Sequence, residues 1–128
     1  MKNLLVVAML GLGLALTGCR SNPIVVSSGK TVYTLQRSYD SYRVLLKEEV
    51  TATHRAVMGG LRNLGLTPTE EKVDKLSGQV TGCLATGEPY VIKMRSLGEE
   101  MTELSLRVGA LADRDLTQRL FEAIEKQL

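Results

Sequence analysis

LTPTEEKVDKLSGQVTGCLATGEPYVIKMRSLGEEMTELSLRVG, residues 66–109, carries the pattern from which the fold class follows. Three of its segments alternate apolar and polar residues with a period of two, which is typical of strands with one buried face. The apolar positions are Val80/Gly82/Leu84, Tyr90/Ile92/Met94 and Leu104/Leu106/Val108. Turn signals at Ser77-Gly78, Thr86-Gly87 and Leu97-Gly98-Glu99 separate the segments. The stretch predicts an antiparallel meander with one wet face, and Pro68 places any strand over residues 66–73 at an edge.

Upstream of the meander, residues 50–64 change to a helical period. One stripe of this predicted helix consists of Val50, Val57, Leu61 and Leu64. Thr51 or Thr53 is the expected N-cap, and Gly65 is expected to take the left-handed position after the last turn. Gly59-Gly60 inside the helix costs about 1 kcal/mol per glycine relative to alanine. Either a neighbouring element approaches closely there, or the helix is weak.

The remaining elements complete the fold class. Residues 38–50 alternate around Tyr42, Val44 and Leu46, which predicts a first strand. Asp113 is the expected cap of a closing helix. Its apolar side is predicted to contain Leu116, Leu120, Ala123, Ile124 and Gln127. We therefore expect a two-layer α+β domain with an antiparallel sheet of four to five strands, two helices on one face and the order β-α-β-β-β-β-α.

The amino terminus, MKNLLVVAMLGLGLALTGCR, has the layout of a secretory signal, because Lys2 precedes an apolar run over residues 4–16 that contains no charge. A membrane-spanning helix needs roughly 20 apolar residues, so this segment is expected to be removed. Leu16-Thr17-Gly18-Cys19 resembles the lipobox of bacterial lipoproteins. The resemblance implies cleavage between Gly18 and Cys19, a diacylglycerol on the Cys19 sulfur and an acyl chain such as palmitate on the new amino group. The alternative is a plain signal peptide in which Cys19 is incidental.

The chain then divides into a lipoprotein signal peptide at residues 1–18, a lipidated amino terminus and tether at 19–37, and a small α+β periplasmic domain at 38–128. Arg20 differs from the aspartate that usually retains such proteins at the inner membrane, so a Gram-negative source would place the anchor in the outer membrane, facing the periplasm. Loss of residues 1–18 lowers the basic count from 16 to 15 against 14 acidic residues, for a net charge of +1. This balance argues against a nucleic-acid partner.

Two residues are chemically suggestive. His54, the single histidine, lies within the apolar stripe of the predicted helix and is interpreted as a core-boundary residue with a polar partner. A role as a base or metal ligand would need Cys83 or a carboxylate nearby. Cys83, the only thiol left after lipidation, is interpreted as an inert strand residue on the side opposite Val80 and Leu84. Exposure would instead allow redox chemistry or an intermolecular disulfide.

Two further groups of residues have simple interpretations. The pairs Glu48-Glu49, Glu70-Glu71 and Glu99-Glu100 are expected at turns and edges, because neighbours in a strand point to opposite faces. Tyr33, Tyr39 and Tyr42 are expected to be partly buried, with a sugar-binding or protein-binding surface as the alternative. The sequence contains no motif typical of a catalytic, cofactor or metal site.

Beyond the lipobox, MGGLRNLGL (58–66), LSGQVTG (76–82), TELSLRVG (102–109) and RDLTQRLFEAIEKQL (114–128) resemble a family of small bacterial lipoproteins that carry a domain of unknown function. The resemblance implies a fold and transfers no site residue except the lipidated Cys19. We expect a non-enzymatic envelope protein, held at the membrane by acyl chains on Cys19, that binds an envelope protein or the cell wall and requires no cofactor or metal. The alternatives are a periplasmic thiol protein or enzyme using Cys83, and a carrier of a small ligand or lipid in a groove near Met94.

Overall fold

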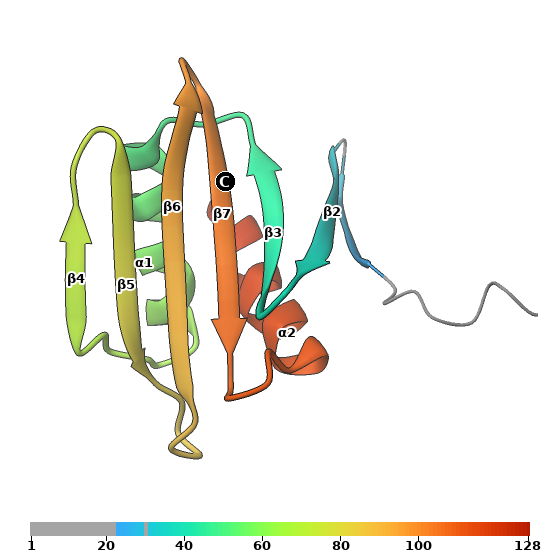
Figure 1. Ribbon diagram of the computed structural model, residues 1–128, viewed down its shortest axis with the longest axis vertical. Helices are drawn as coiled ribbons and strands as arrows, with labels where there is room; N and C mark the ends of the chain where they lie inside the picture. Colours follow the sequence, from blue (N-terminus) through green and yellow to red (C-terminus); the bar gives the residue numbers. More distant parts are fainter. Residues whose placement is uncertain (1–22, 30) are drawn as a thin grey trace, which may run out of the picture.

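The computed structural model describes residues 23–29 and 31–128, so the signal segment, Gly18 and Cys19 lie outside the described residues. One antiparallel sheet of seven strands forms one layer, and two helices cover one of its faces (Figure 1). The elements are β1 (Ile24–Ser28), β2 (Thr31–Ser38), β3 (Ser41–Leu46), α1 (Val50–Asn63), β4 (Glu70–Val73), β5 (Ser77–Cys83), β6 (Pro89–Gly98), β7 (Met101–Val108) and α2 (Arg114–Glu125). The strand order across the sheet is β1-β2-β3-β7-β6-β5-β4. The predicted two-layer α+β class is confirmed.

The predicted count of four to five strands is too low, because β1 and β2 fall where we predicted a tether over residues 19–37. Ile24 and Leu35 are fully buried, and Val26 is 6% exposed. These residues contact α2 and the rest of the core, so their burial depends on an element about 90 positions further along the chain. The apolar patch alone was too short to reveal this, and the surrounding Ser, Pro and Gly residues favoured a loop.

β2 belongs to two pairings, and this explains the bend visible at the β1–β2 hairpin (Figure 1). Its first part pairs with β1, from Ile24↔Leu35 to Ser28↔Thr31. Its last three residues pair with β3, from Gln36↔Arg43 to Ser38↔Ser41. Tyr33 meets Phe121 of α2 edge to face, with the ring centroids 5.5 Å apart. The amino-terminal hairpin therefore packs against α2 as part of the core.

The meander follows the predicted alternation. The side chains that face the helices are buried in β3, β6 and β7, and Val80 and Gly82 are buried in β5, whereas Leu84 is only partly buried. β4 occupies the sheet edge, as Pro68 predicted. The turn predicted at Ser77-Gly78 lies earlier, because the Asp74 carboxylate accepts the N–H groups of Leu76 and Ser77 at 2.8 and 2.9 Å, and β5 begins at Ser77. These two hydrogen bonds lower the pKa of Asp74.

Both helices form where the periodicity placed them, but their ends differ in detail. In α1, Glu49 is the N-cap without a side-chain cap bond, so the prediction of Thr51 or Thr53 is wrong. The carboxyl end is as predicted, because Gly65 has φ +72° and the Leu66 N–H donates to the Leu61 carbonyl at 2.9 Å. In α2, Asp113 accepts the Leu116 N–H at 2.9 Å and is confirmed as the cap.

The buried side of α2 is wider than predicted. Thr117 and Phe121 are fully buried, whereas Gln127 is exposed because the helix ends at Glu125. Phe121 occupies the centre of this side and meets the β1–β2 hairpin, whose strands the sequence did not reveal. The sequence analysis therefore missed β1, β2 and the buried Phe121 for the same reason, because these elements bury one another across a long stretch of the chain.

The glycine pair of α1 marks the contact between the two helices. A Cβ added at Gly60 would lie 2.8 Å from the backbone nitrogen of Ile124 in α2. A Cβ added at Gly59 would lie 2.8 Å from Oε1 of Gln127, which belongs to an exposed and flexible side chain. The interpretation that a neighbouring element approaches closely is confirmed at Gly60, where backbone meets backbone.

We predict opposite effects of alanine at the two neighbouring glycines. Gly60→Ala should lower the free energy of unfolding by about 1–3 kcal/mol, because the backbone of α2 would have to move away. Gly59→Ala should leave it unchanged or raise it by up to about 1 kcal/mol, because Gln127 can rotate aside and alanine favours the helix. Urea denaturation followed by circular dichroism measures both values. Equal losses for the two variants would show that the helices do not meet at Gly60.

The core contains one tyrosine hydroxyl without a partner among the described residues. Tyr90 is 1% exposed, and its hydroxyl oxygen lies against Gly82 with no hydrogen bond. Burial, with a smaller contribution from Cys83, raises the pKa of Tyr90 above its usual value of 10. The folded state therefore holds this hydroxyl in its neutral form, and the stability that depends on it is present below the usual pKa and is lost as the pH rises above it.

Tyr90→Phe should therefore change the pH dependence of stability. At neutral pH the variant should be about 1 kcal/mol more stable, because an unpaired hydroxyl leaves the core. Between about pH 9 and pH 11 the free energy of unfolding of the wild type should fall more steeply than that of the variant. Urea titrations across this range provide the comparison, and parallel curves would contradict the assignment. Tyr33, whose pKa is also raised by burial, is present in both proteins.

Candidate functional site

The sheet face opposite the helices is covered by no other element of the described chain, and we call it the open face. Its side chains alternate with the core positions of β3 to β7, and the strand register aligns them in rows. The open face includes Arg43, Leu45, Glu70, Lys72, Gln79, Thr81, Cys83, Val91, Lys93, Arg95, Glu103, Ser105 and Arg107. Most of these side chains are polar or charged, and Leu45 and Val91 are the large apolar ones. The open face is therefore the wet face that the alternation predicted.

Glu103 organises the charges at the centre of the open face. Its side chain is 19% exposed and lies 3.2 Å from Nη2 of Arg95 on β6 and 4.0 Å from Nη1 of Arg43 on β3. β7 separates these two strands in the sheet, and Glu103 on β7 therefore reaches a cation on each side. The three charges hold one another in place across three strands.

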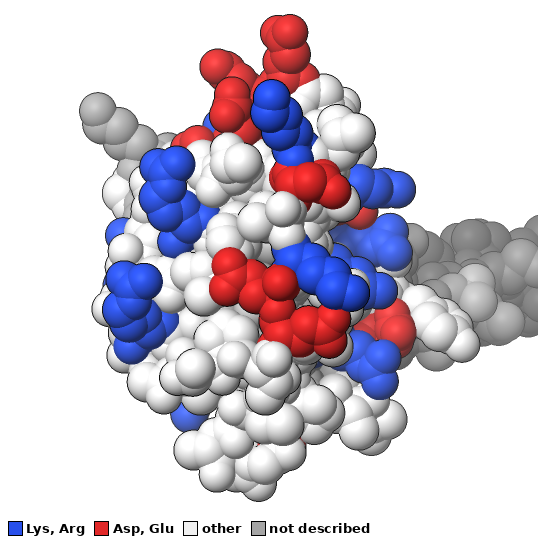
Figure 2. Space-filling view, turned by 90° about the vertical axis from the view of Figure 1, so that its left-hand side faces the viewer, with Lys and Arg blue, Asp and Glu red and all other residues white. Residues whose placement is uncertain are grey.

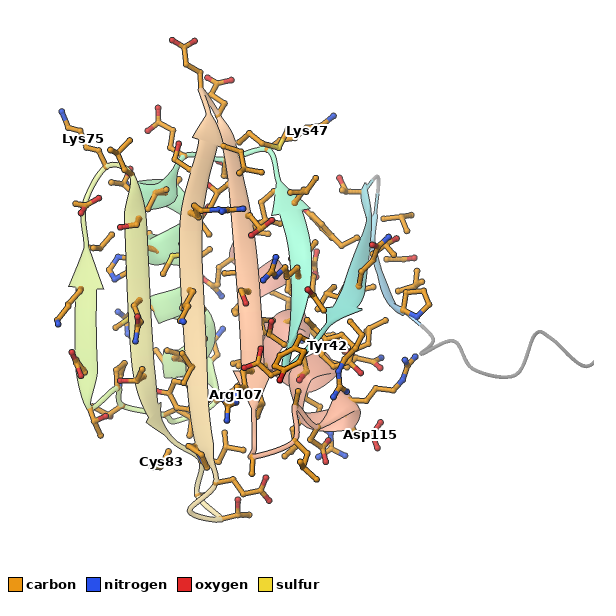
Figure 3. The ribbon with its side chains drawn as sticks, in the orientation of Figure 1. Tyr42, Lys47, Lys75, Cys83, Arg107 and Asp115 are labelled. Atoms are coloured by element: carbon orange, nitrogen blue, oxygen red, sulfur yellow. The ribbon has the colours of Figure 1, made fainter. Side chains whose placement is uncertain are left out.

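A second charge pair lies toward the lower end of the sheet, where Nη1 of Arg107 is 3.4 Å from Oδ2 of Asp40 (Figure 3). Lys93 lies between the Glu103 group and the Arg107–Asp40 pair, and it is aligned with Ser105 on β7 and Gln79 on β5. It has no ion pair with the described residues. A cavity of about 130 Å³ opens at this point. Its lining includes Lys93, Ser105, Arg107 and Arg43. The centre of the open face thus combines the ion pairs of Glu103 and Asp40 with Lys93, which has no ion pair with the described residues.

A wider groove adjoins this centre where β2 turns away from β3. It has a volume of about 620 Å³ and is lined in part by Val32, Arg37, Leu45 and Glu103. Val32 is 63% exposed and Leu45 is 57% exposed. Exposed apolar side chains beside fixed charges are typical of a protein-binding surface, in which an apolar centre is surrounded by a polar rim.

Acidic and basic side chains are intermixed on the side of the molecule where β4 lies (Figure 2). Acidic groups gather at the upper end and again near the middle of this side (Figure 2), and Glu99 and Glu100 occupy the turn between β6 and β7. On β4 itself, Glu70 lies 3.2 Å from Lys72. No single sign of charge dominates this side.

Cys83 and His54 are not brought together. Cys83 is exposed at the end of β5 on the open face, near the lower end of the sheet (Figure 3). His54 lies on α1, and its partner Glu71 sits on the helix side of β4, opposite the buried Val80. The sheet therefore separates the thiol from the imidazole. The pairing that a thiol enzyme with a histidine base requires is absent from this geometry.

His54 is a core-boundary residue with a polar partner, as its place in the helical stripe predicted. Its side chain is 16% exposed, and Nε2 lies 2.8 Å from Oε1 of Glu71. The contact joins an imidazole nitrogen to a carboxylate oxygen. It links the first turns of α1 to the edge strand.

The other sequence candidates are placed as follows. Tyr42 is buried, and the guanidinium carbon of Arg37 lies 5.4 Å from the centroid of the Tyr42 ring. Tyr33 is half-buried, whereas Tyr39 is 96% exposed. Glu70 and Glu71 point to opposite faces of β4, as expected of neighbours in a strand. Met94, which the carrier hypothesis placed in a groove, is 2% exposed inside the core. Cys19 and Gly18 lie outside the described residues.

Two searches of the described residues gave negative findings. Residues 23–29 and 31–128 contain no group of three or more His, Cys, Asp or Glu side chains placed to hold a metal ion. In the same residues, neither helix has the length and hydropathy that crossing a bilayer requires. The site residues of the open face were not singled out from the sequence. The pattern that could have identified them is the series of basic side chains at alternate positions of the strands. These side chains lie close together only because β7 lies between β3 and β6 in the sheet.

Comparison with known proteins gives one positive finding. A family model described as "Protein of unknown function (DUF3568)" matches residues 2–127. No curated protein matches the chain. The match spans the apolar amino-terminal segment as well as every described strand and helix.

Proposed function

The chain belongs to the DUF3568 family of proteins of unknown function, and we propose that it is a lipid-anchored, non-enzymatic module of the bacterial cell envelope that binds a protein partner with the open face. The anchor is the set of acyl chains on Cys19, and the favoured location is the outer membrane, facing the periplasm. The open face carries the proposal for binding, because it presents exposed Leu45, next to exposed Val32 of the adjoining groove, beside the charges paired with Glu103.

The anchor is supported by the order of residues at the amino terminus. A charged start, an apolar run and Leu16-Thr17-Gly18-Cys19 follow one another in the arrangement of a lipoprotein signal. A single acyl chain binds a membrane only marginally, whereas several chains on one residue hold a protein stably. A domain carried in this way needs no membrane-spanning element of its own.

A binding role is favoured over catalysis by the character of the open face. Its central cavity of about 130 Å³ is small for a substrate pocket, since such pockets typically occupy roughly 300–1,000 Å³. The wider groove beside it, at about 620 Å³, lies within this range but exposes the apolar side chains of Val32 and Leu45 at the surface. Exposed apolar side chains beside a group of paired charges match a protein surface better than a small molecule.

A thiol function of Cys83 is the second candidate, because the side chain is exposed and free. Its position on the open face would let it form a disulfide with a partner chain in an oxidising compartment. This alternative predicts that the partner is captured through Cys83, whereas the main proposal predicts capture independent of it.

The anchor predicts a sharp difference between the two cysteines. Cys19→Ala should block lipidation, so the precursor keeps its leader and its amino-terminal peptide carries no diacylglycerol. Cys83→Ala is the matched control and should be processed like the wild type. Mass spectrometry of the amino-terminal peptide and fractionation of the membranes measure both. A Cys19→Ala protein that is still cut and still sediments with the outer membrane would refute the anchor.

The open face predicts a matched pair of leucine variants. Leu45→Glu should reduce crosslinking of the partner in cells by about tenfold, which corresponds to ~1.4 kcal/mol of binding free energy, because a charge replaces an exposed apolar side chain of the groove. Leu97→Glu, at a leucine that is 47% exposed near the carboxyl end of β6, should leave crosslinking unchanged. Both substitutions lie outside the core. Equal yields from the two variants would exclude the open face as the binding surface.

A further inference from the structure

We propose that the end of the domain around the start of α2 rests on the lipid bilayer, with the Leu111 side chain among the acyl chains and Tyr39 at the level of the headgroups. We call this end the anchor end, and it consists of Pro23, the β2–β3 turn at residues 39–40 and the loop at 109–113 between β7 and α2. The inference rests on the proposed acylation of Cys19, and it adds an orientation of the domain on the membrane.

The number of residues between the anchor and the domain limits how far the domain can rise. Three residues, 20–22, separate Cys19 from Pro23, and β1 begins at Ile24. Even a fully extended chain spans at most about 14 Å over four residue steps. The headgroup layer alone is roughly 5–7 Å thick on each side of the hydrocarbon core. Because β1 and β2 belong to the domain, no long tether remains to lift it away from the surface.

Hydrogen bonds tie the three segments of the anchor end together. Nη2 of Arg114 donates to the Pro23 carbonyl at 3.2 Å. Arg37, which lies just before the β2–β3 turn, donates to the carbonyls of Leu111 and Ala112 at 3.2 and 3.4 Å. The place where the chain enters the domain is therefore fixed to the same loop that presents Leu111. In Figure 1 the β2–β3 turn and the loop between β7 and α2 lie in the lower half of the molecule, near the start of α2, whereas the β5–β6 turn is its lowest point.

The two most exposed large apolar side chains of the described residues lie at this end. Tyr39 is 96% exposed and Leu111 is 85% exposed, compared with 72% for Leu76, the next in order. Leu76 follows Lys75 at the upper end (Figure 3). Tyrosine is enriched at membrane interfaces because its ring is apolar and its hydroxyl is polar, and leucine favours the hydrocarbon region. The anchor end thus presents a tyrosine suited to the headgroup region and a leucine suited to the hydrocarbon region.

Tyr39 occupies a backbone position that favours glycine. Its φ of +53° lies in the left-handed region, where glycine is the default residue and other side chains are strained. Glu100 in the β6–β7 turn and Ala112 share this conformation, each with φ +54°. An exposed tyrosine that contributes nothing to the core fits a role in contact with another surface.

The anchor end has no excess of basic groups, so the apolar contact and the anchor determine the docking. Arg37, Arg107 and Arg114 lie there together with Asp40, Asp113 and Asp115, and the Glu88 carboxylate lies beside Gly109. A basic surface would require anionic lipids for its contact. The anchor end should instead rest equally well on a zwitterionic bilayer.

The experiment uses the acylated full chain in phosphatidylcholine vesicles whose acyl chains carry bromine, a short-range quencher of tryptophan fluorescence. The chain contains no tryptophan, so Leu111→Trp and Leu76→Trp each introduce one probe, and both positions are exposed. Leu111→Trp should be quenched roughly threefold more strongly than Leu76→Trp and should emit at shorter wavelength, as expected for a side chain buried in the bilayer interface. Equal quenching of the two probes would overturn the proposal.

Two controls separate the possible failures. Mass spectrometry and co-flotation with the vesicles show whether the protein is acylated and bound. A bound, acylated protein with unquenched Leu111→Trp overturns the docking while leaving the anchor intact, whereas an unacylated protein refutes the proposed function itself. Tyr39→Gly in the Leu111→Trp background should weaken the quenching without unfolding the domain, because glycine accepts the backbone conformation at this position. Quenching that stays the same in this variant would exclude Tyr39 from the contact.

Discussion

The contact between Gly60 of α1 and the backbone of Ile124 in α2 determines how the two layers fit together. Seven strands present a broad apolar face, and only two helices are available to cover it. Because no side chain separates the helices at Gly60, they lie close enough to share that face. The Tyr33–Phe121 contact then packs the β1–β2 hairpin against α2. With both helices on one side, the opposite side of the sheet is left to the charged open face.

Local patterns predicted the elements whose partners are their neighbours in sequence. Alternation placed Val80, Ile92 and Leu106 in the core, and the Asp113 cap needed only the three residues that follow it. β1 and β2 were missed because Ile24 and Leu35 are buried by α2, which forms at the far end of the chain. A strand of this kind has no signal of its own that distinguishes it from a short apolar patch in a linker.

The candidate site was less predictable than the fold for the same physical reason. The sequence predicted that polar positions face water, but the strand order decides which of them meet. Glu103 contacts Arg43 and Arg95 only because β7 lies between β3 and β6, an order that the sequence did not specify. The separation of Cys83 from His54 likewise follows from register, since a shift by one residue would have reversed the face that the thiol occupies.

The position of β1 has a mechanical consequence. It is an edge strand that pairs only with β2, and its first residue, Ile24, is the one nearest the amino terminus. A force applied through that terminus acts along an antiparallel hairpin from its open end, so the hydrogen bonds break in succession rather than sharing the load. The hairpin would yield first, beginning at Ile24↔Leu35, while the β3–β7 and β6–β7 pairings remain intact. The fold therefore contains an extensible segment between its entry point and its rigid centre.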